Sequence, residues 1–392
     1  MGSVSALGVD LDGFWKSLSA GVCGLRNAQV GSGANRCDCI VGAADSFDPT
    51  RYFDAAQLAE LDRFTQLALV ASREAIRDSG LDLTKEPDEV AVVIGTGGGG
   101  ENTRELVTTR LHSGLRSVHP LSIPAAMPSA PCSHIAMENG ITGPVFSTSS
   151  ACASSTHAVG IAVSLIRQGA ARIAVAGGSD ASLTYPVVRA WQRLRVLSTD
   201  TCRPFSRGRK GLVLAEGAGV VVLEKLRDAE RRGAPIYAEV AGFGMCCDAF
   251  DLLKPSKAGM LRCMKKALDD AEVDPGDVGY INAHGTGTVL NDVLETRAIR
   301  DAFHAQAERI SISSTKSMHG HALGASGALE LVATAMSVRE GIVPPTANYA
   351  EPDPECDLDY VPNQARELSV KAAMTNSFAF GGLNAVLVLK RL

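Results

Sequence analysis

The chain has 392 residues, of which 45% are hydrophobic and 21% charged, and its formal net charge is −5. This composition is typical of a folded globular protein, and it gives no electrostatic reason to expect a nucleic acid as partner, because phosphate binding needs a clustered basic surface. No apolar run approaches the roughly 20 residues that cross a bilayer, and residues 1–20 lack the basic start and apolar block of a secretory signal, so we expect a cytoplasmic protein without membrane insertion.

The predicted elements describe a duplicated chain. An amphipathic helix over residues 56–78 precedes the β-type run Val90–Ile94, and the order returns as a helix over 260–270 and a strand over 278–281. Later segments also repeat, since residues 165–169 match 337–341, and each unit ends in an apolar strand, over 220–223 and 385–389. Alternating strands and helices predict parallel sheets covered by helices, so we expect two α/β units, residues 1–240 and 241–392.

One cysteine has a distinctive position. The ten cysteines form no paired CxxC units, and we expect most to be reduced and buried. Cys152 directly precedes a segment with helical apolar spacing, where the helix dipole and free N–H groups lower a thiol pKa and can hold an oxyanion. Taken alone, a cysteine among small residues is more often part of a core.

Two histidines follow predicted strands. His284 comes directly after the strand ending at Asn282, and His321 precedes a glycine-rich stretch. Loops at strand ends collect at one edge of an α/β sheet, where catalytic groups usually lie. An isolated histidine of this kind is also compatible with an ordinary loop side chain.

Six motifs occur in order along nearly the whole chain. They are Ser150–Ala153, Arg203–Phe205, Glu216–Gly219, His284–Thr288 with Asp292 and Glu295, Lys316–His321, and Asn376–Gly382. In this order they resemble the elongating, synthase II-like β-ketoacyl-acyl-carrier-protein synthases. The resemblance implies a thiolase-like five-layered αβαβα fold built from two duplicated halves. It also implies a homodimer, with a heterodimer as the alternative.

The resemblance implies a role for each residue that matches the family pattern. Cys152 is expected to take the acyl chain from its carrier, while His284 and His321 bind the malonyl thioester carbonyl and promote decarboxylation. Lys316 is expected to orient the histidines. The remaining assignments are Glu330 as partner of Lys316, Asp292 and Glu295 as supports of the loop, Phe380 as the gate whose N–H joins that of Cys152 in an oxyanion hole, and Thr286 and Thr288 as contacts of the phosphopantetheine arm. No cofactor and no metal are expected, and acyl carrier protein is the expected partner.

The sequence departs from the family pattern at several points. The strand of about ten residues that opens relatives is missing before Gly2, so either the start site is placed late or the N-terminal sheet lacks an edge strand. Ala379 replaces a usual glycine, which predicts a stiffer gate. Leu253, Val289 and Asp251 replace common Thr, Pro and His near the entrance, which leaves the acyl preference open.

Rival readings are weaker. Gly95-x-Gly97-x-x-Gly100 resembles a dinucleotide turn, but no acidic residue follows at the required distance. A degradative thiolase would have a second reactive cysteine near Phe380, where this chain has two glycines. An initiating synthase would have Asn in place of His321. A chain-length-factor-like subunit would lack the nucleophile, whereas Cys152 is present. His319 and His321 have no third metal ligand with suitable spacing.

For docking of the acidic carrier, the sequence offers a local basic patch of Arg207, Arg209 and Lys210, with Arg63 as a further candidate. An ordinary solvated charge run is the alternative. The pathway stays open between fatty-acid synthesis and a specialised polyketide or nodulation-type product.

Overall fold

We describe the protein from a computed structural model covering residues 1–33, 35–115 and 117–392. The N-terminal half is built on a five-stranded sheet in the order β1-β8-β6-β4-β5. Its strands are β1 (Gly2–Ser5), β8 (Gly217–Glu224), β6 (Ile173–Asp180), β4 (Val90–Gly95) and β5 (Val145–Thr148). β4 pairs in parallel with β5 and β6, whereas β8 is antiparallel to β6 and β1.

The C-terminal half repeats this sheet strand for strand. Its order, read from the matching edge, is β9-β15-β14-β10-β11. The strands are β9 (Glu239–Cys247), β15 (Leu383–Lys390), β14 (Ala372–Ala379), β10 (Val278–Asn282) and β11 (Ser311–Ser313). The predicted duplication is therefore confirmed.

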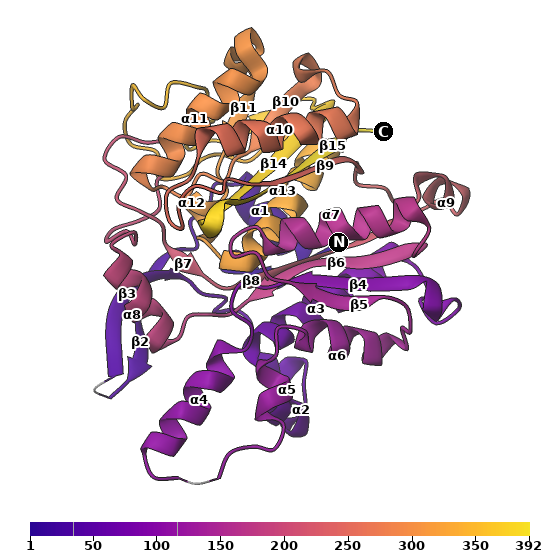
Figure 1. Cartoon of the computed structure of the whole chain (residues 1–392), viewed down its shortest axis with the longest axis vertical. Coiled ribbons are helices and arrows are strands. Elements are labelled where there is room, and N and C mark those ends of the chain that lie inside the picture. The colour runs from indigo at the N-terminus through magenta and orange to yellow at the C-terminus, as the bar shows by residue number, and fades with distance from the viewer. Residues whose placement is uncertain (34, 116) are drawn as a thin grey trace.

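Helices cover both sheets and fill the space between them (Figure 1). α3 (Arg63–Ser79) and α6 (Ala130–Asn139) cover the outer face of the N-terminal sheet, and α10 (Lys257–Ala271) and α11 (Val289–Phe303) that of the C-terminal sheet. α7 (Ser154–Gln168) and α13 (Ser326–Glu340) lie between the sheets, and residues 326–338 of α13 are all buried. These five layers match the expected thiolase-like αβαβα fold.

Smaller elements connect the layers. The helices are α1 (Leu11–Ser19), α2 (Ala55–Glu60), α4 (Glu101–His112), α5 (Ser122–Ala126), α8 (Tyr185–Leu194), α9 (Leu226–Arg231) and α12 (Lys316–His319). The strands are β2 (Arg26–Ser32), β3 (Asn35–Gly42), β7 (Leu214–Ala215), β12 (Ile342–Val343) and β13 (Arg366–Glu367). The 3-10 turns are η1 (Pro49–Arg51), η2 (Pro87–Glu89), η3 (Pro275–Asp277), η4 (His304–Arg309), η5 (Leu323–Ala325) and η6 (Phe380–Gly382).

The structure corrects three expectations about individual elements: the N-terminal edge strand, the helix over residues 56–78 and the boundary between the halves. Gly2–Ser5 forms the edge strand that the sequence pattern left in doubt, pairing with Gly217–Val220 of β8. The helix expected over 56–78 is two helices, because the carboxylate of Asp62 caps the start of α3. The division at residue 240 falls inside β9, which begins at Glu239.

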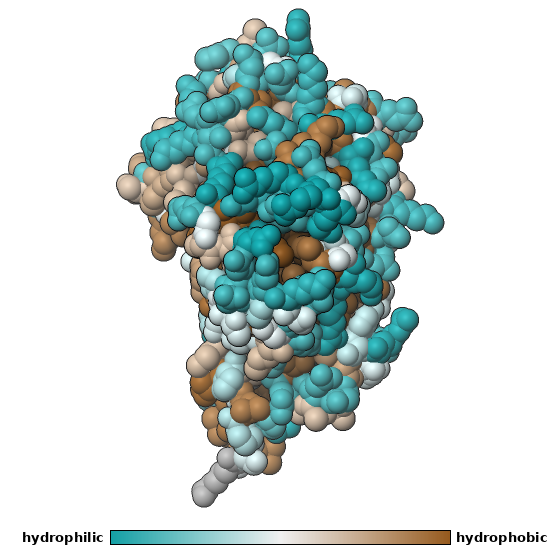
Figure 2. Space-filling model, turned by 90° about the vertical axis from the view of Figure 1, so that its right-hand side faces the viewer, coloured by the Kyte–Doolittle hydropathy of each residue, from teal (hydrophilic) through white to brown (hydrophobic). Residues whose placement is uncertain are grey.

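One face of the molecule carries a hollow with an apolar floor (Figure 2). A cavity of about 360 Å³ lies there, lined by side chains of both halves that include Val163, Val221 and Leu331. Among the described residues, no helix is long and apolar enough to cross a membrane.

Candidate active site

Cys152 lies just before the N-terminus of α7, as the helical spacing predicts. The preceding Ala151 has a φ of 49°, a left-handed conformation that turns the chain sharply between β5 and α7. This turn is closed by the hydroxyl of Ser154, which accepts the N–H of Ser150 and donates to the carbonyl of Ala151. The thiol is thereby fixed at the base of a cleft and is only 6% exposed.

The pKa of Cys152 corrects the sequence-based expectation. Burial raises it to about 11, although the charge of Lys316 and the N–H of Phe380 act in the opposite direction. The helix terminus stabilises a thiolate, but removing that thiolate from water costs more, and burial of this kind cannot be read from the local sequence. In the resting site the thiol is protonated, and the nucleophile needs a nearby proton acceptor.

His284 and His321 supply neutral imidazoles beside this thiol. The sulfur and one ring nitrogen of each histidine all lie within 4.8 Å of one another, and the two rings meet edge to face at 5.5 Å. Burial, reinforced by the charge of Lys316, lowers both histidine pKa values well below the usual 6.5. The site therefore holds two uncharged side chains that can each accept or donate a proton.

One ring nitrogen of each histidine is free for a substrate. Nδ1 of His321 lies 2.7 Å from the hydroxyl of Ser326, which leaves Nε2 buried without a partner among the described residues. Nδ1 of His284 is also buried and unpaired within that part of the chain. Buried polar atoms of this kind are costly unless a ligand satisfies them, so both point to a bound carbonyl oxygen.

Lys316 and Glu330 form an ion pair that is fully withdrawn from solvent. Lys316 begins α12, and Glu330 projects from the first turns of α13, so the pair joins two elements that flank His321. Burial raises the pKa of Glu330 to about 7. The arrangement places a cation close to both histidines, in agreement with the expected partnership.

Asp292 and Glu295 hold the loop that carries His284. Glu295 accepts the backbone N–H groups of His284 and Gly285, each at 2.8 Å. Asp292 accepts the N–H of Phe205 at 2.8 Å and that of Gly287 at 3.3 Å. Both carboxylates project from α11, so one helix fixes this loop.

The cleft above Cys152 has a volume of about 160 Å³. Thr286 and Thr288 line its wall, with their hydroxyls 2.9 Å apart. The N–H of Phe380 is directed at the Cys152 sulfur, and its ring stacks on Trp191 with centroids 5.5 Å apart.

Ala379 has φ −99° and ψ 158°, an extended conformation open to any residue. Glycine is therefore not needed there, and the positive φ values of the turn fall on Gly381 and Gly382. The turn at Phe380 keeps its glycines where the backbone requires them.

Asp180, which ends β6, was not among the residues predicted from the sequence. Its buried carboxylate accepts the N–H groups of Gly97 and Gly324, each at 2.7 Å, and the hydroxyl of Thr96 at 3.0 Å. An acidic residue at the carboxyl end of an apolar strand was the available signal. Because Asp180 also accepts the N–H of Gly98, at 3.3 Å, these glycine N–H groups are not free to bind a nucleotide phosphate.

The structure contradicts Arg209 as a member of the expected basic docking patch and leaves the docking role of the other members a prediction. Arg209 is buried, lies 3.5 Å from Asp292 and donates to Asp353 at 2.5 Å. Arg63 makes a bidentate pair with the buried Glu216, and Lys210 pairs with Asp200 at 2.9 Å. Asp353 lies 144 positions from Arg209 and Glu216 153 positions from Arg63, so no local pattern reveals these two pairs, whereas Asp200 is only 10 positions from Lys210.

Arg207 is the remaining member of the patch, and its side chain is exposed. Metal binding has a single geometric candidate in the described part of the chain, which is the trio of Cys152, His284 and His321 itself. His319 is not part of it, since its Nε2 lies 3.0 Å from the hydroxyl of Thr315.

Comparisons with known proteins agree with this geometry. A family model described as "Beta-ketoacyl synthase, N-terminal domain" matches residues 1–229, and one described as "Beta-ketoacyl synthase, C-terminal domain" matches residues 237–350. "Nodulation protein E" of Rhizobium sp. (strain N33) is 46% identical over 393 residues, which is 100% of this chain and 98% of that protein. "3-oxoacyl-[acyl-carrier-protein] synthase 2" of Staphylococcus aureus (strain COL) is 39% identical over 400 residues, covering 100% of this chain and 97% of that protein.

Two solved structures extend the comparison. "The ishigamide ketosynthase/chain length factor" superposes with a TM-score of 0.93 at 34% identity, covering 100% of this chain and 97% of that one. A second structure, "AntDE:AntF (apo): type II PKS acyl-carrier protein in complex with its ketosynthase bound to the hexaketide", gives a TM-score of 0.89 at 32% identity, with coverage of 100% and 98%.

Proposed function

The chain belongs to the β-ketoacyl synthase family, and we propose that Cys152, His284 and His321 perform the condensation that this family catalyses. The protein is a β-ketoacyl-acyl-carrier-protein synthase, an acyltransferase that extends an acyl chain with a malonyl unit. The observation that carries the proposal for these residues is that one thiol and two neutral imidazoles meet at the base of a single cleft.

In the first half-reaction, the Cys152 sulfur attacks the carbonyl carbon of an acyl-carrier thioester. The thiol proton passes to a neutral imidazole of the site, since the raised pKa of Cys152 keeps the thiol protonated until substrate arrives. The N–H groups of Cys152 and Phe380 stabilise the oxyanion that forms. Collapse of this intermediate breaks the bond to the carrier sulfur, which leaves as a thiol after taking the proton.

In the second half-reaction, the malonyl thioester carbonyl accepts hydrogen bonds from His284 and His321. Loss of carbon dioxide leaves its electron pair as an enolate, whose oxygen these two donors stabilise. The enolate carbon attacks the Cys152 thioester, a carbon–carbon bond forms, and the cysteine sulfur leaves as a thiolate. A proton from solvent then restores the resting thiol. Burial, reinforced by the charge of Lys316, lowers the pKa of both imidazoles and keeps them uncharged, so that they do not trap the enolate as an ion pair.

No cofactor takes part in this scheme. The substrates arrive on the phosphopantetheine of acyl carrier protein, and the hydroxyls of Thr286 and Thr288 line the wall that this arm passes. The histidine donors supply the electrostatic stabilisation that a metal would otherwise give. If a metal were required, a strong chelator would abolish condensation and added zinc would restore it.

Acyl carrier protein is the partner, as the name of the staphylococcal relative and the carrier-bound ketosynthase indicate. We also propose a dimer, preferably of two identical chains. β5 is an unpaired sheet edge within the described residues, and its Phe146 is exposed. Exposed apolar side chains continue along the projection of α4 and α5 (Figures 1 and 2); they include Leu106, Leu111 and Ile123.

A heterodimer with a chain-length-factor-like subunit is the alternative, because such a pairing occurs in the ishigamide structure. This chain keeps Cys152 and both histidines, so it would be the condensing member of the pair. Size determination of the purified protein separates the two arrangements. We also propose that the protein works in the cytoplasm, together with the acyl carrier protein that delivers its substrates.

A specialised product is the second candidate for the pathway. The nodulation relative is 46% identical, against 39% for the synthase of Staphylococcus aureus, which favours a nodulation-type acyl chain. Incubation of the purified protein with malonyl-carrier and a panel of acyl-carriers, with the products identified by mass, tests both the condensation reaction and the acyl chain that it prefers. Absence of any β-ketoacyl product would contradict the condensation, whereas the chain lengths accepted decide the pathway.

A further inference from the structure

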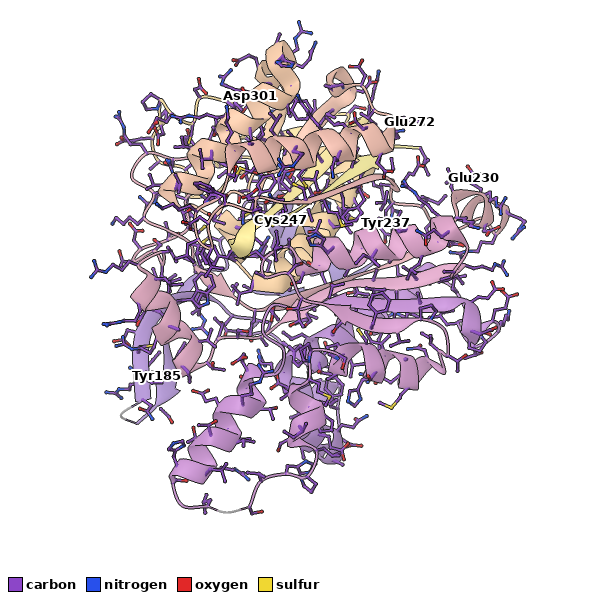
Figure 3. All side chains as sticks on the ribbon, viewed as in Figure 1. Tyr185, Glu230, Tyr237, Cys247, Glu272 and Asp301 are labelled. Atoms are coloured by element: carbon purple, nitrogen blue, oxygen red, sulfur yellow. The ribbon has the colours of Figure 1, made fainter. Side chains whose placement is uncertain are left out.

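Two thiols outside the catalytic cleft meet between β9 and α10. They belong to Cys246, near the end of β9, and Cys263, in the middle of α10. Figure 3 labels Cys247, the last residue of β9, which directly follows Cys246. Neither thiol of the pair lines the cleft of Cys152, so the condensation leaves both without a role.

Each thiol of the pair reaches the element that carries the other. The Cys246 sulfur lies 3.3 Å from the carbonyl oxygen of Gly259 in α10, and the Cys263 sulfur lies 3.3 Å from that of Gly244 in β9. Gly244 and Cys246 occupy the same face of the strand, and Gly259 and Cys263 lie about one turn apart on the helix. The thiol of Cys263 also donates a hydrogen bond to the sulfur of Cys246. This contact brings the two sulfurs within reach of one another, as a disulfide requires.

The two thiols differ in their charge at neutral pH. The hydrogen bonds from Cys263 and from the amide of Asn384 lower the pKa of Cys246 to about 6, against the effect of burial. The same hydrogen bond, together with burial, raises the pKa of Cys263 well above its ordinary value. Cys246 is therefore a half-buried thiolate beside a protonated thiol. A thiolate that solvent can reach is the form that peroxides oxidise, and a neighbouring thiol can convert the product to a disulfide.

The end of β9 also holds the turn that carries Phe380. Asn384 lies opposite Cys246 in β15, and its amide donates to the carboxylate of Asp248 at 2.7 Å. The N–H of Asp248 in turn donates to the carbonyl of Gly382 at 2.8 Å. A displacement of Cys246 toward α10 therefore acts on this turn, which lines the catalytic cleft.

We propose that Cys246 and Cys263 are a peroxide-reactive dithiol whose oxidation slows condensation. The Cys246 thiolate attacks one oxygen of hydrogen peroxide, the oxygen–oxygen bond breaks, and Cys246 becomes a sulfenic acid with hydroxide as the leaving group. The sulfur of Cys263 then attacks the sulfenic sulfur, its proton and the departing hydroxide form water, and a disulfide remains. The disulfide is shorter than the contact that it replaces, so it draws the end of β9 toward α10. The effect on condensation rests on the proposed function, whereas formation of the disulfide does not.

Treatment of the purified protein with hydrogen peroxide at neutral pH, followed by digestion without reductant and peptide mapping by mass, tests the proposal. We expect a disulfide between Cys246 and Cys263 and a condensation rate at least about threefold lower, because small displacements beside reacting groups are costly. Dithiothreitol should restore the rate. In Cys263→Ala, which keeps a small apolar side chain in the core, dimedone should trap Cys246 as the sulfenic acid. Cys247→Ser is the matched control, since it removes the exposed neighbouring thiol and should leave the disulfide and the loss of rate unchanged.

Other outcomes overturn the proposal. Peroxide that leaves Cys246 reduced, or that joins it to Cys247, shows that Cys263 is not its partner. A disulfide without any change of rate separates the pair from the Phe380 turn. An equal loss of rate in Cys246→Ser and in the unsubstituted protein assigns the inhibition to another thiol, such as Cys152. If the reduced protein forms the disulfide but condenses no substrate, the proposed function fails while the dithiol stands.

Discussion

The carboxylate of Asp180 accepts the backbone N–H of Gly324 at 2.7 Å, and so joins the end of β6 to the loop that follows His321. It also accepts the N–H of Gly97 from the loop after β4. β6 belongs to the half that carries Cys152, and Gly324 to the half that carries His321. One buried carboxylate thus sets the position of the nucleophile relative to a histidine donor.

Asp180→Ala should weaken both fold and site. The substitution leaves several buried N–H groups without an acceptor, so we expect the free energy of unfolding to fall by about 2–3 kcal/mol. Condensation by the folded fraction should fall at least about tenfold, because the loop after His321 loses its anchor. Denaturant unfolding and the condensation assay measure these effects.

Asp180→Asn keeps one carbonyl oxygen and should recover part of the stability and part of the rate. A folded Asp180→Ala enzyme with full activity would show that the carboxylate serves only the fold.

The sequence predicted what depends on local pattern. The strand over 90–94, the helix over 260–270 and the place of Cys152 at a helix start all follow from apolar spacing, and the structure confirms them. The features that could not be predicted from the sequence depend on contacts between residues that are far apart along the chain. Arg209 meets Asp353 across 144 positions, and Thr96 meets Asp180 across 84, so neither partner was visible. The raised pKa of Cys152 likewise needs the packing of both halves.

His284→Ala and His321→Ala should separate the two half-reactions. Decarboxylation needs both donors on the malonyl carbonyl, so each variant should lose it by about 100-fold or more. Self-acylation of Cys152 should largely remain, since the other neutral imidazole can still accept the thiol proton. Carbon dioxide release and mass analysis of the acyl-enzyme give the two rates; equal loss of both would make the histidines activators of the nucleophile.

The decarboxylation rate should not fall as the pH decreases from about 8 to about 6. Burial and the charge of Lys316 lower the pKa values of both histidines, so protonation begins well below the usual 6.5. Carbon dioxide release from malonyl-carrier by the Cys152→Ala variant follows this step without acyl transfer. An acidic limb centred near pH 6.5 would contradict the neutral state assigned to these imidazoles.

Cys152 and Cys246 should respond differently to pH. Burial raises the pKa of Cys152 to about 11, so its alkylation by iodoacetamide should still increase between pH 7 and 9. The hydrogen bond from Cys263 lowers the pKa of the half-buried Cys246 to about 6, so its alkylation should be constant over this range. Peptide mapping after brief labelling measures both rates.

An acyl-carrier substrate, by contrast, should label Cys152 alone among the ten cysteines. Alkylation of Cys152 that is already constant above pH 7 would mean that the helix terminus outweighs burial.

Arg209→Gln should lower the stability of the fold without a specific effect on carrier docking. Arg209 is 3% exposed and faces Asp292, which is fully buried and holds the loop of His284. Removing one partner of a buried ion pair typically costs about 3–5 kcal/mol, so the denaturation midpoint should fall sharply. Because this loop carries a catalytic donor, activity with carrier-borne substrates and activity with short-arm substrates should fall to the same degree.

Arg207→Gln is the matched control. The side chain of Arg207 is exposed, so this variant should leave the free energy of unfolding within about 0.5 kcal/mol of the unsubstituted value. A stable Arg209→Gln enzyme that is impaired only with the carrier would restore Arg209 as a docking residue.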